Sequence, residues 1–182
     1  MRVLLTGSSG WLGRFDARPP HFMLFGPPTW LATALLCATP GARRFAQSLP
    51  LAALIGCQIF RIPVEWVLFG LARAGTAPAQ MTFEGWNFDV LTGVTAPLVA
   101  WLAARGTLGR GALFAWNAAG LALLVNVVTI AVLSTPTPLR VFMNEPAARF
   151  LADWPWVWLP GFLVPAAFAG HLLLFRKLRA LR

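Results

Sequence analysis

Residues 112–133 read ALFAWNAAGLALLVNVVTIAVL, a run that contains no ionisable side chain. An α-helix needs about 20 consecutive apolar residues to cross the hydrocarbon core of a bilayer. This run is long enough to do so. Its most polar side chains are those of Asn117 and Asn126, followed by that of Thr129. The stretch therefore predicts a transmembrane helix and assigns the chain to the membrane class.

The composition of the whole chain agrees with this assignment. Of its 182 residues 58% are hydrophobic and 12% are charged, and the mean hydropathy is +0.67. Soluble domains carry about 25% charged residues. The net charge of +9 would suit a nucleic-acid-binding protein, but the arginines lie at the ends of apolar segments and form no separate basic face. We therefore expect the lipid bilayer as partner and exclude nucleic acid.

Four more segments approach the length of a membrane span, so the sequence predicts an all-α integral membrane helical bundle of about five transmembrane helices. The first is the weakest, because Gly26-Pro27-Pro28 interrupts it, and its helix is expected to begin near Pro27. A single transmembrane domain would occupy residues 21–182, after an N-terminal tail, 1–20, that is expected to be disordered or atypical. The expected spans are 22–39, 49–71, 88–104, 112–133 and 156–175.

Basic residues predict the orientation of the bundle. Loops 40–48 and 105–111 and the C-terminal tail would share one side of the membrane, and together they hold Arg43, Arg44, Arg105, Arg110, Arg176, Lys177, Arg179 and Arg182. The positive-inside rule then places the N-terminus outside and the C-terminus in the cytoplasm. Arg2, Arg14 and Arg18 in the N-terminal tail argue for the opposite orientation.

The first residues carry a motif of a different kind. TGSSGWLG (residues 6–13) resembles the first turn of the extended short-chain dehydrogenases and sugar epimerases, in which glycines let the backbone approach a pyrophosphate. Such a site also needs a helix, which the prolines at 19–20 stop, and an acid after the second strand; after Asp16 the next acid is Glu65. The family's catalytic pair is missing, because the chain has no Tyr and only Lys177. We therefore expect neither NAD(P) nor another cofactor.

From about residue 49 onward the chain resembles a family of uncharacterised bacterial integral membrane proteins. The likeness lies in FRIPVEW, MTFEGWNFDVLTGVTAPLVAWL, AWNAAGLALLVNVVTIAVLS and FMNEPA. The resemblance implies a location in the bacterial inner (cytoplasmic) membrane. It implies no activity and no catalytic residues.

Charged side chains inside a predicted span are the main candidates for function, because they are costly in the membrane and usually face a bundle interior or a cavity. Arg61 and Glu65 are spaced i, i+4 and so share a helix face with Gln58. Asn126, on another span, falls at a similar depth. We expect these four residues to form one polar cluster. Either Arg61 and Glu65 form a neutralised pair that fixes helix packing, or the cluster binds a polar or anionic ligand or a proton.

Two weaker candidates lie elsewhere. Glu84, Asn87 and Asp89 offer oxygen atoms within one loop, but they match no calcium-loop spacing, so capping of the next helix by Asn87 or Asp89 is the preferred interpretation and no metal site is expected. His171 would lie about one turn from the inner end of the last span. His21, the other histidine, would be on the opposite side, so His171 is interpreted as a hydrogen-bonded packing residue.

Two main functional hypotheses follow. The first is a small permease-like or ligand-binding membrane protein built around Arg61 and Glu65. The second is a non-catalytic membrane subunit or scaffold, in a homo-oligomer or with a partner membrane subunit, whose polar residues only fix packing. Small residues along the fourth span, which permit close helix contact, serve the bundle itself in our preferred interpretation and a homodimer in the other: Ala115, Ala118, Ala119 and Ala122. A membrane-embedded enzyme that uses Glu65, Glu84 or Asp89 is a distant third hypothesis.

Overall fold

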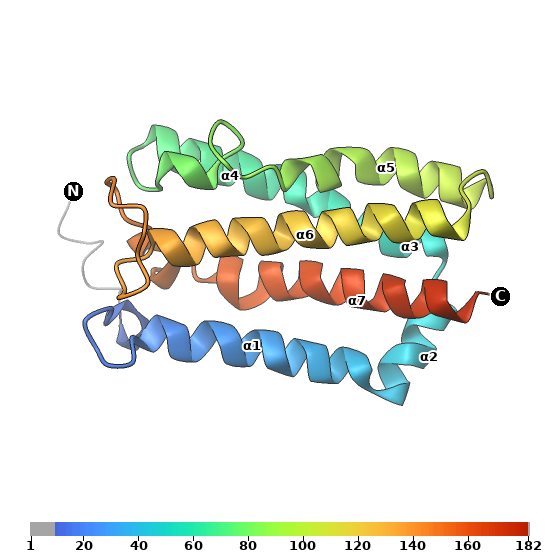
Figure 1. Cartoon of the computed structure of the whole chain (residues 1–182), viewed down its shortest axis with the longest axis horizontal. Helices are drawn as coiled ribbons and strands as arrows, with labels where there is room; N and C mark the ends of the chain where they lie inside the picture. Colours follow the sequence, from blue (N-terminus) through green and yellow to red (C-terminus); the bar gives the residue numbers. More distant parts are fainter. Residues whose placement is uncertain (1–9, 182) are drawn as a thin grey trace.

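The computed structural model describes residues 10–181, and all regular secondary structure in this range is helical. The long helices run along one axis and alternate in direction, so that α1 begins and α7 finishes at opposite ends of the molecule (Figure 1). The main elements are α1 (His21–Ala38), α2 (Pro40–Ser48), α3 (Leu51–Gly56), α4 (Arg61–Arg73), α5 (Val90–Ala104), α6 (Arg110–Ser134) and α7 (Val164–Ala180).

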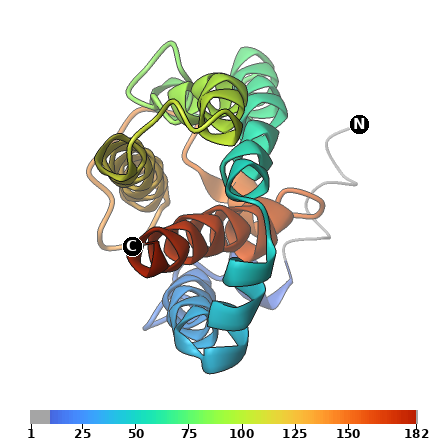
Figure 2. The ribbon, with the colours of Figure 1, turned by 90° about the vertical axis from the view of Figure 1, so that its right-hand side faces the viewer.

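Helix α7 is the centre of the bundle. It contacts α1, α2, α3 and α6. In the view along the axis it lies between α1 on one side and α5 on the other (Figure 2). Short 3-10 helices, Trp11–Gly13, Ala79–Met81 and Arg149–Ala152, lie outside the long helices.

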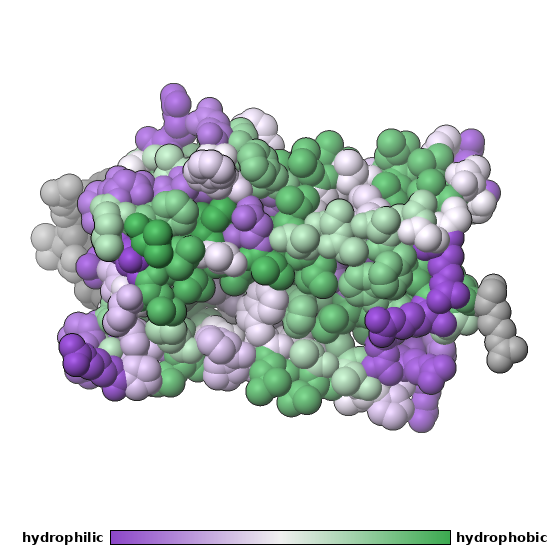
Figure 3. All heavy atoms as spheres, in the orientation of Figure 1, coloured by the Kyte–Doolittle hydropathy of each residue, from purple (hydrophilic) through white to green (hydrophobic). Residues whose placement is uncertain are grey.

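Three of the helical segments are long and apolar enough to cross a membrane: Leu51–Arg73, Arg110–Ser134 and Leu159–Ala180. Helices α1 and α2 would together supply a fourth span, although they meet at an angle of 72°. The remaining apolar helix, α5, is shorter. Hydrophobic side chains cover the middle of the face shown in Figure 3, and hydrophilic ones gather toward the two ends of its long axis.

Two of the long segments change helix type, in both cases close to a proline. Between α3 and α4 the chain forms a 3-10 turn at Cys57–Phe60, just before Pro63. Before α7 it forms a π-helical turn at Leu159–Leu163, which includes Pro160. Proline lacks the N–H that would continue the regular hydrogen-bond ladder, so neighbouring carbonyls need other partners.

The helix boundaries correct several expectations. Helix α1 begins at His21 and contains Pro27 and Pro28, so it does not begin near Pro27; Phe22 in its first turn is buried, which stabilises the extra turn. Helix α7 continues to Ala180, five residues beyond the expected end of the last span. As a result His171 lies more than two turns from the end of its helix and is deeper in the bundle than expected.

The N-terminal region is described from residue 10 onward, so the first half of the dehydrogenase-like motif, residues 6–9, lies outside the described residues. The described part of the expected tail, residues 10–20, contacts the bundle through Phe15. Phe15 is buried and packs with Phe22 in a hydrophobic cluster. Trp11 stacks on the His21 ring with 4.2 Å between centroids.

The core is divided along the bundle axis. At the end that holds the long loops, Leu68 and Ile130 belong to a cluster that also contains Phe150 and Leu151. At the opposite end Leu54, Ile55, Leu113, Leu174 and Leu178 form a second cluster. The helix segments between the two clusters carry buried polar side chains, and these form the site described below. The alanines at 115, 118, 119 and 122 are exposed, so they do not pack within this bundle. The preferred interpretation of these small residues is therefore wrong.

Candidate functional site

Arg61, in the first turn of α4, is the centre of a buried hydrogen-bond network. Its side chain is 2% exposed. It contacts the turn before α4, the start of α5, the Gly120 carbonyl of α6, and α7. Nε donates to Gln58 Oε1 at 3.2 Å, and Nη1 forms an ion pair with Asp89 Oδ1 just before α5. Nη2 lies 2.8 Å from His171 Nε2 on α7. One guanidinium therefore joins α4 to α5 and α7.

The hydrogen bonds also fix the state of His171. Asn117 on α6 donates its amide to the His171 backbone carbonyl at 3.0 Å, which orients the Asn117 side chain. Asn117 Oδ1 therefore faces His171 Nδ1 at 2.7 Å and must accept a proton from it. Nε2 is then left without a proton and accepts from Arg61. The imidazole is thus the neutral tautomer with its hydrogen on Nδ1.

Glu65, one turn beyond Arg61, has a different partner. The amide of Asn87 donates to both of its carboxylate oxygens, at 2.7 and 2.8 Å, and lies 2.9 Å from the Met81 carbonyl. Asn87 Oδ1 in turn accepts from the Asp89 backbone N–H at 3.0 Å. The segment between α4 and α5 is thereby folded into the bundle, and α5 begins at the depth of Arg61.

Three glycines allow the helices to close around this network. A Cβ atom added at Gly120 on α6 would lie 2.8 Å from His171 Cε1 and 2.9 Å from Thr92 Cγ2. At Gly170 on α7 it would lie 2.6 Å from Gln58 Nε2, and at Gly93 on α5 it would meet α4 at 3.0 Å. The distances at Gly120 and Gly170 are shorter than real Cβ contacts, and the one at Gly93 is tighter than most, so larger residues would separate the helices that carry the network.

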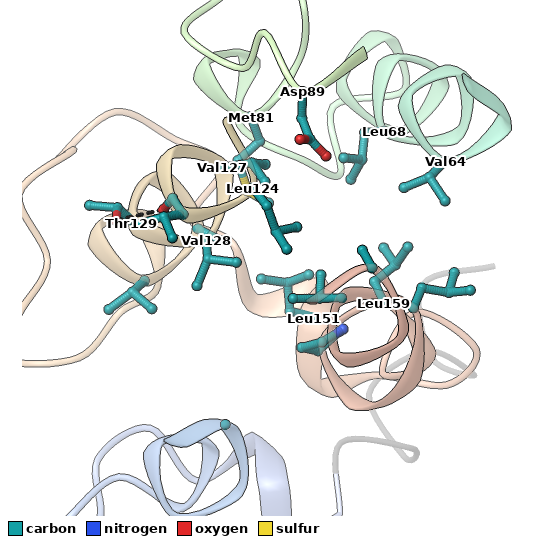
Figure 4. Close-up of a pocket in the computed structure, with 18 of the residues that line it drawn as sticks. Val64, Leu68, Met81, Asp89, Leu124, Val127, Val128, Thr129, Leu151 and Leu159 are labelled. Atoms are coloured by element: carbon teal, nitrogen blue, oxygen red, sulfur yellow. Dashed lines mark hydrogen bonds between the residues drawn. The ribbon is translucent and has the colours of Figure 1, made fainter. Parts of the chain in front are cut away.

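A cavity of about 300 Å³ borders the network on the side of the long loops. Its walls come from α1, α4, α6 and the start of the last helical segment, and they are almost entirely apolar, with Val64, Leu124, Val128 and Leu159 among them. Figure 4 shows the Asp89 carboxylate pointing into this space from the same side as Met81 and Leu68. Arg61 and Glu65 also reach its wall.

Asp89 is the side chain that connects the network to the cavity. Its Oδ1 is bound by Arg61, whereas Oδ2 makes no hydrogen bond to residues 10–181. A hydrogen-bond acceptor is therefore presented to an apolar space. This arrangement can bind a molecule that has an apolar body and one polar donor group.

The structure places the predicted residues in several positions. Gln58 and Arg61 lie together at the centre. Glu65 is adjacent, but the direct ion pair between Arg61 and Glu65 predicted from their spacing is not formed, because Asp89 occupies that side of the guanidinium. Asn126 is outside the cluster and donates to the Trp86 carbonyl at 2.8 Å. It lies about 13 Å farther along α6 than Asn117, the asparagine that does join the network.

The loop candidates do not converge on one point. Glu84 is exposed, while Asn87 and Asp89 are buried and bound to other residues. Asp89 makes no side-chain capping bond at α5; Asn87 accepts the Asp89 N–H instead. Within residues 10–181 no group of three or more His, Cys, Asp or Glu side chains is arranged to hold a metal ion.

Sequence reasoning did not assign Asp89, Asn117 or His171 to the central cluster. A usable signal was present, because Asn117 and His171 are polar residues inside strongly apolar spans and are expected to face other polar groups. His171 does make hydrogen bonds, as expected, but with Arg61 at the bundle centre.

Comparison with known proteins supplies a family. The pattern of a domain of unknown function, DUF8737, matches residues 19–179. The chain belongs to the DUF8737 family. The match covers the bundle from just before α1 to the last turn of α7, and it begins after the dehydrogenase-like motif. No curated protein and no solved structure matches the chain. The function of this DUF8737 protein must therefore be argued from its own site.

Proposed function

We propose that this chain is a multi-pass membrane protein that binds a lipophilic molecule with a hydrogen-bond-donating or cationic group in the central cavity. The observation that carries the proposal is the position of Asp89, whose carboxylate points into a cavity with otherwise apolar walls (Figure 4). The apolar body of the ligand would displace water from those walls. Its donor group would bind Asp89 Oδ2.

The balance of charges favours a donor or a cation over an anion. Two carboxylates, Glu65 and Asp89, lie beside the single guanidinium of Arg61, and the neutral His171 adds no charge. An anionic ligand would place a further negative charge beside these two acidic side chains in a buried site, at a considerable cost in free energy. A cationic ligand group or a bound proton would instead balance the site. The polar or proton-binding form of our sequence hypothesis is thus preferred to the anionic form.

The membrane placement is part of the proposal. We infer five crossings, in which α5 is completed by the inward-folded segment before it, since its 15 residues span only about 22 Å. The end that holds α2 and the last turns of α7 is basic and would be cytoplasmic. The sequence resemblance supports the bacterial inner membrane. A binding site between the two ends of the bundle would suit a permease-like role, in which the same site is reached from both sides of the membrane.

The scaffold hypothesis is the alternative, and one observation favours it. Apart from Asp89 Oδ2, which faces the cavity, the fully enclosed side-chain polar atoms of residues 10–181 all have hydrogen-bond partners except Thr92 Oγ1 and Asp153 Oδ1. A network this well satisfied can serve solely to hold α4, α5, α6 and α7 in register. In that case the cavity would be filled by bulk lipid chains and would show no preference for a donor group.

Native mass spectrometry of protein purified in a mild detergent separates the two hypotheses. Binding predicts a co-purified small molecule on the wild type that is lost in Asp89→Asn. The matched control is Glu84→Gln, which removes an exposed carboxylate from the same loop and should retain the molecule. Identical spectra for the wild type and Asp89→Asn, with both proteins folded, would favour the scaffold.

A further inference from the structure

A second hollow lies at the basic end of the molecule, between the C-terminal turns of α1, helix α2 and the outer face of α7. It has a volume of about 560 Å³ and is separate from the central cavity, with which it shares no lining residue. Three arginines line it, Arg43, Arg176 and Arg179, and no acidic residue does. Its charge is therefore opposite to that of the central site.

The groove has an apolar half and a basic half. On α7 the lining residues recur every three or four positions, which places Phe168, Leu172, Phe175 and Arg179 along one face of the helix. From Phe168 to Arg179 the groove extends about 16 Å along the axis. The apolar side chains are toward the bundle centre and the arginines toward its end, where hydrophilic residues gather in Figure 3.

The basic half is held in place by hydrogen bonds to the backbone. Thr39 Oγ1 accepts from the Ala42 N–H and caps α2, which carries Arg43. Lys177 Nζ donates to the carbonyls of Ala46, Gln47 and Leu49, at 3.3, 3.1 and 2.6 Å, and so ties the end of α2 to α7. Arg176 Nη1 donates to the Cys37 carbonyl.

The arginines keep donors available for a ligand. The side chains of Arg43 and Arg179 make no hydrogen bond or ion pair with residues 10–181. A guanidinium has five N–H donors, so Arg176 also retains several after its bond to Cys37. Guanidinium groups bind phosphate oxygens strongly, and their fork geometry suits bidentate contacts.

We propose that this groove binds an anionic phospholipid, with its phosphate against Arg43, Arg176 and Arg179 and one acyl chain against Phe168, Leu172 and Phe175. Three positive charges and no negative one favour an anionic headgroup over a zwitterionic one. The apolar half distinguishes a lipid from a free anion, since a free phosphate would gain nothing there. The inference rests on the membrane placement proposed above and is independent of the central cavity's ligand.

The test uses the full-length protein in nanodiscs of phosphatidylcholine with a minor fraction of phosphatidylglycerol or cardiolipin. Native mass spectrometry after release measures which lipids stay bound. We expect the wild type to retain the anionic lipid in preference to phosphatidylcholine. In Arg43→Gln/Arg179→Gln this preference should fall at least tenfold. The control, Arg44→Gln/Arg105→Gln, removes two arginines from the same end that do not line the groove, and it should keep the preference.

Further measurements keep the outcomes distinct. The preference should survive millimolar inorganic phosphate and should weaken in Leu172→Gln; displacement by phosphate with no effect of Leu172→Gln would overturn the lipid in favour of a free anion. Equal loss in both double variants, or no preference in the wild type, would overturn the site.

Alkaline carbonate extraction tests the membrane placement separately. Release of the protein refutes that placement, whereas retained protein without lipid preference refutes only this groove. The single variant Arg43→Gln, on exposed α2, replaces the double variant if the latter unfolds, and should show part of the loss.

Discussion

Two ion pairs are formed among residues 10–181, and they differ in almost every respect. Arg61 and Asp89 are 28 residues apart, and their side chains are 2% and 7% exposed. Arg140 and Glu145 lie in one loop, with N–O distance 2.9 Å and exposures of 15% and 71%. The first pair joins the start of α4 to the start of α5, whereas the second closes a short turn and joins no helices.

The difference between the pairs lies in what replaces water. Solvent screens the exposed Glu145 and would solvate it alone, while Arg140 would keep the carbonyls of Phe142 and Asn144 as partners. Around Arg61 and Asp89, the surrounding polar groups are Gln58, His171 and the backbone of Gly120. A buried charge without its partner is strongly destabilising, while an intact buried pair can be nearly neutral in free energy. The inner pair should thus behave as a unit and the outer pair should not.

The largest effect is expected from Arg61→Gln. It leaves the buried Asp89 carboxylate without its ion-pair partner, which should lower the free energy of unfolding by about 3–5 kcal/mol. Asp89→Asn should act in the same direction, and the double variant Arg61→Gln/Asp89→Asn should lose less than the sum of the two. Melting temperatures of all four proteins in one detergent measure this cycle. Strictly additive losses would show that the two residues do not act as a unit.

A helix-packing variant tests the same centre without changing a charge. Gly120→Ala places a Cβ against His171, which two hydrogen bonds hold in place, so we expect a loss of about 1–3 kcal/mol. Gly111→Ala on the same helix has open space around it and should leave the protein as stable or slightly more stable. Equal melting temperatures for both variants would mean that the helices are not closely packed around the network.

Glu65→Gln should have a smaller effect and sharpens the assignment of partners. The side-chain carbonyl that this substitution introduces could still accept from Asn87, and Glu65 makes no ion pair with Arg61 that would be lost, so the loss should stay within about 1 kcal/mol. A cycle that combines it with Arg61→Gln measures the coupling between the two. If that coupling equalled the one between Arg61 and Asp89, Glu65 would be as much a partner of Arg61 as Asp89 is, as the i, i+4 spacing predicts.

The smallest effect is expected at the exposed pair. The hydrogen bond from Arg140, with a further one from the Ala147 backbone, lowers the pKa of Glu145. The carboxylate therefore contributes stability above its unfolded pKa, and this contribution is lost as the pH falls through the lower folded value. Glu145→Gln should change the melting temperature at pH 7 by no more than about 2 °C. The difference between variant and wild type should vanish in acid; a difference that grows in acid would contradict this sign.

The sequence predicted the helical architecture well because long apolar runs leave few alternatives. The run at 112–133 lies within α6, and Arg61 was recognised as a central residue from its charge alone. Boundaries were less accurate, since the chain tolerates Pro27 and Pro28 inside α1 and continues α7 past residue 175. Those extra turns are stabilised by tertiary contacts, which local sequence does not encode.

The partners of Arg61 were the part that sequence could not supply. The i, i+4 rule identifies neighbours on one helix, so it selected Glu65. Asp89 reaches Arg61 because the segment before α5 folds inward, through the bonds of Asn87 with Glu65 and Met81. Asn126 was chosen over Asn117 by counting depth from the span ends, a method that says nothing about which face of α6 points inward.

The most direct test of the proposed binding site compares three ligands with one chain length and different head groups. Decylamine, decanol and decanoate are added at equal concentrations to wild-type protein and to Asp89→Asn, and the change in melting temperature is measured for each. We predict stabilisation of the wild type in the order decylamine, decanol, decanoate, with the difference between amine and carboxylate largely lost in Asp89→Asn. Stabilisation by decanoate above decylamine, or the same order and size in the variant, would contradict a cavity that selects its ligand through Asp89.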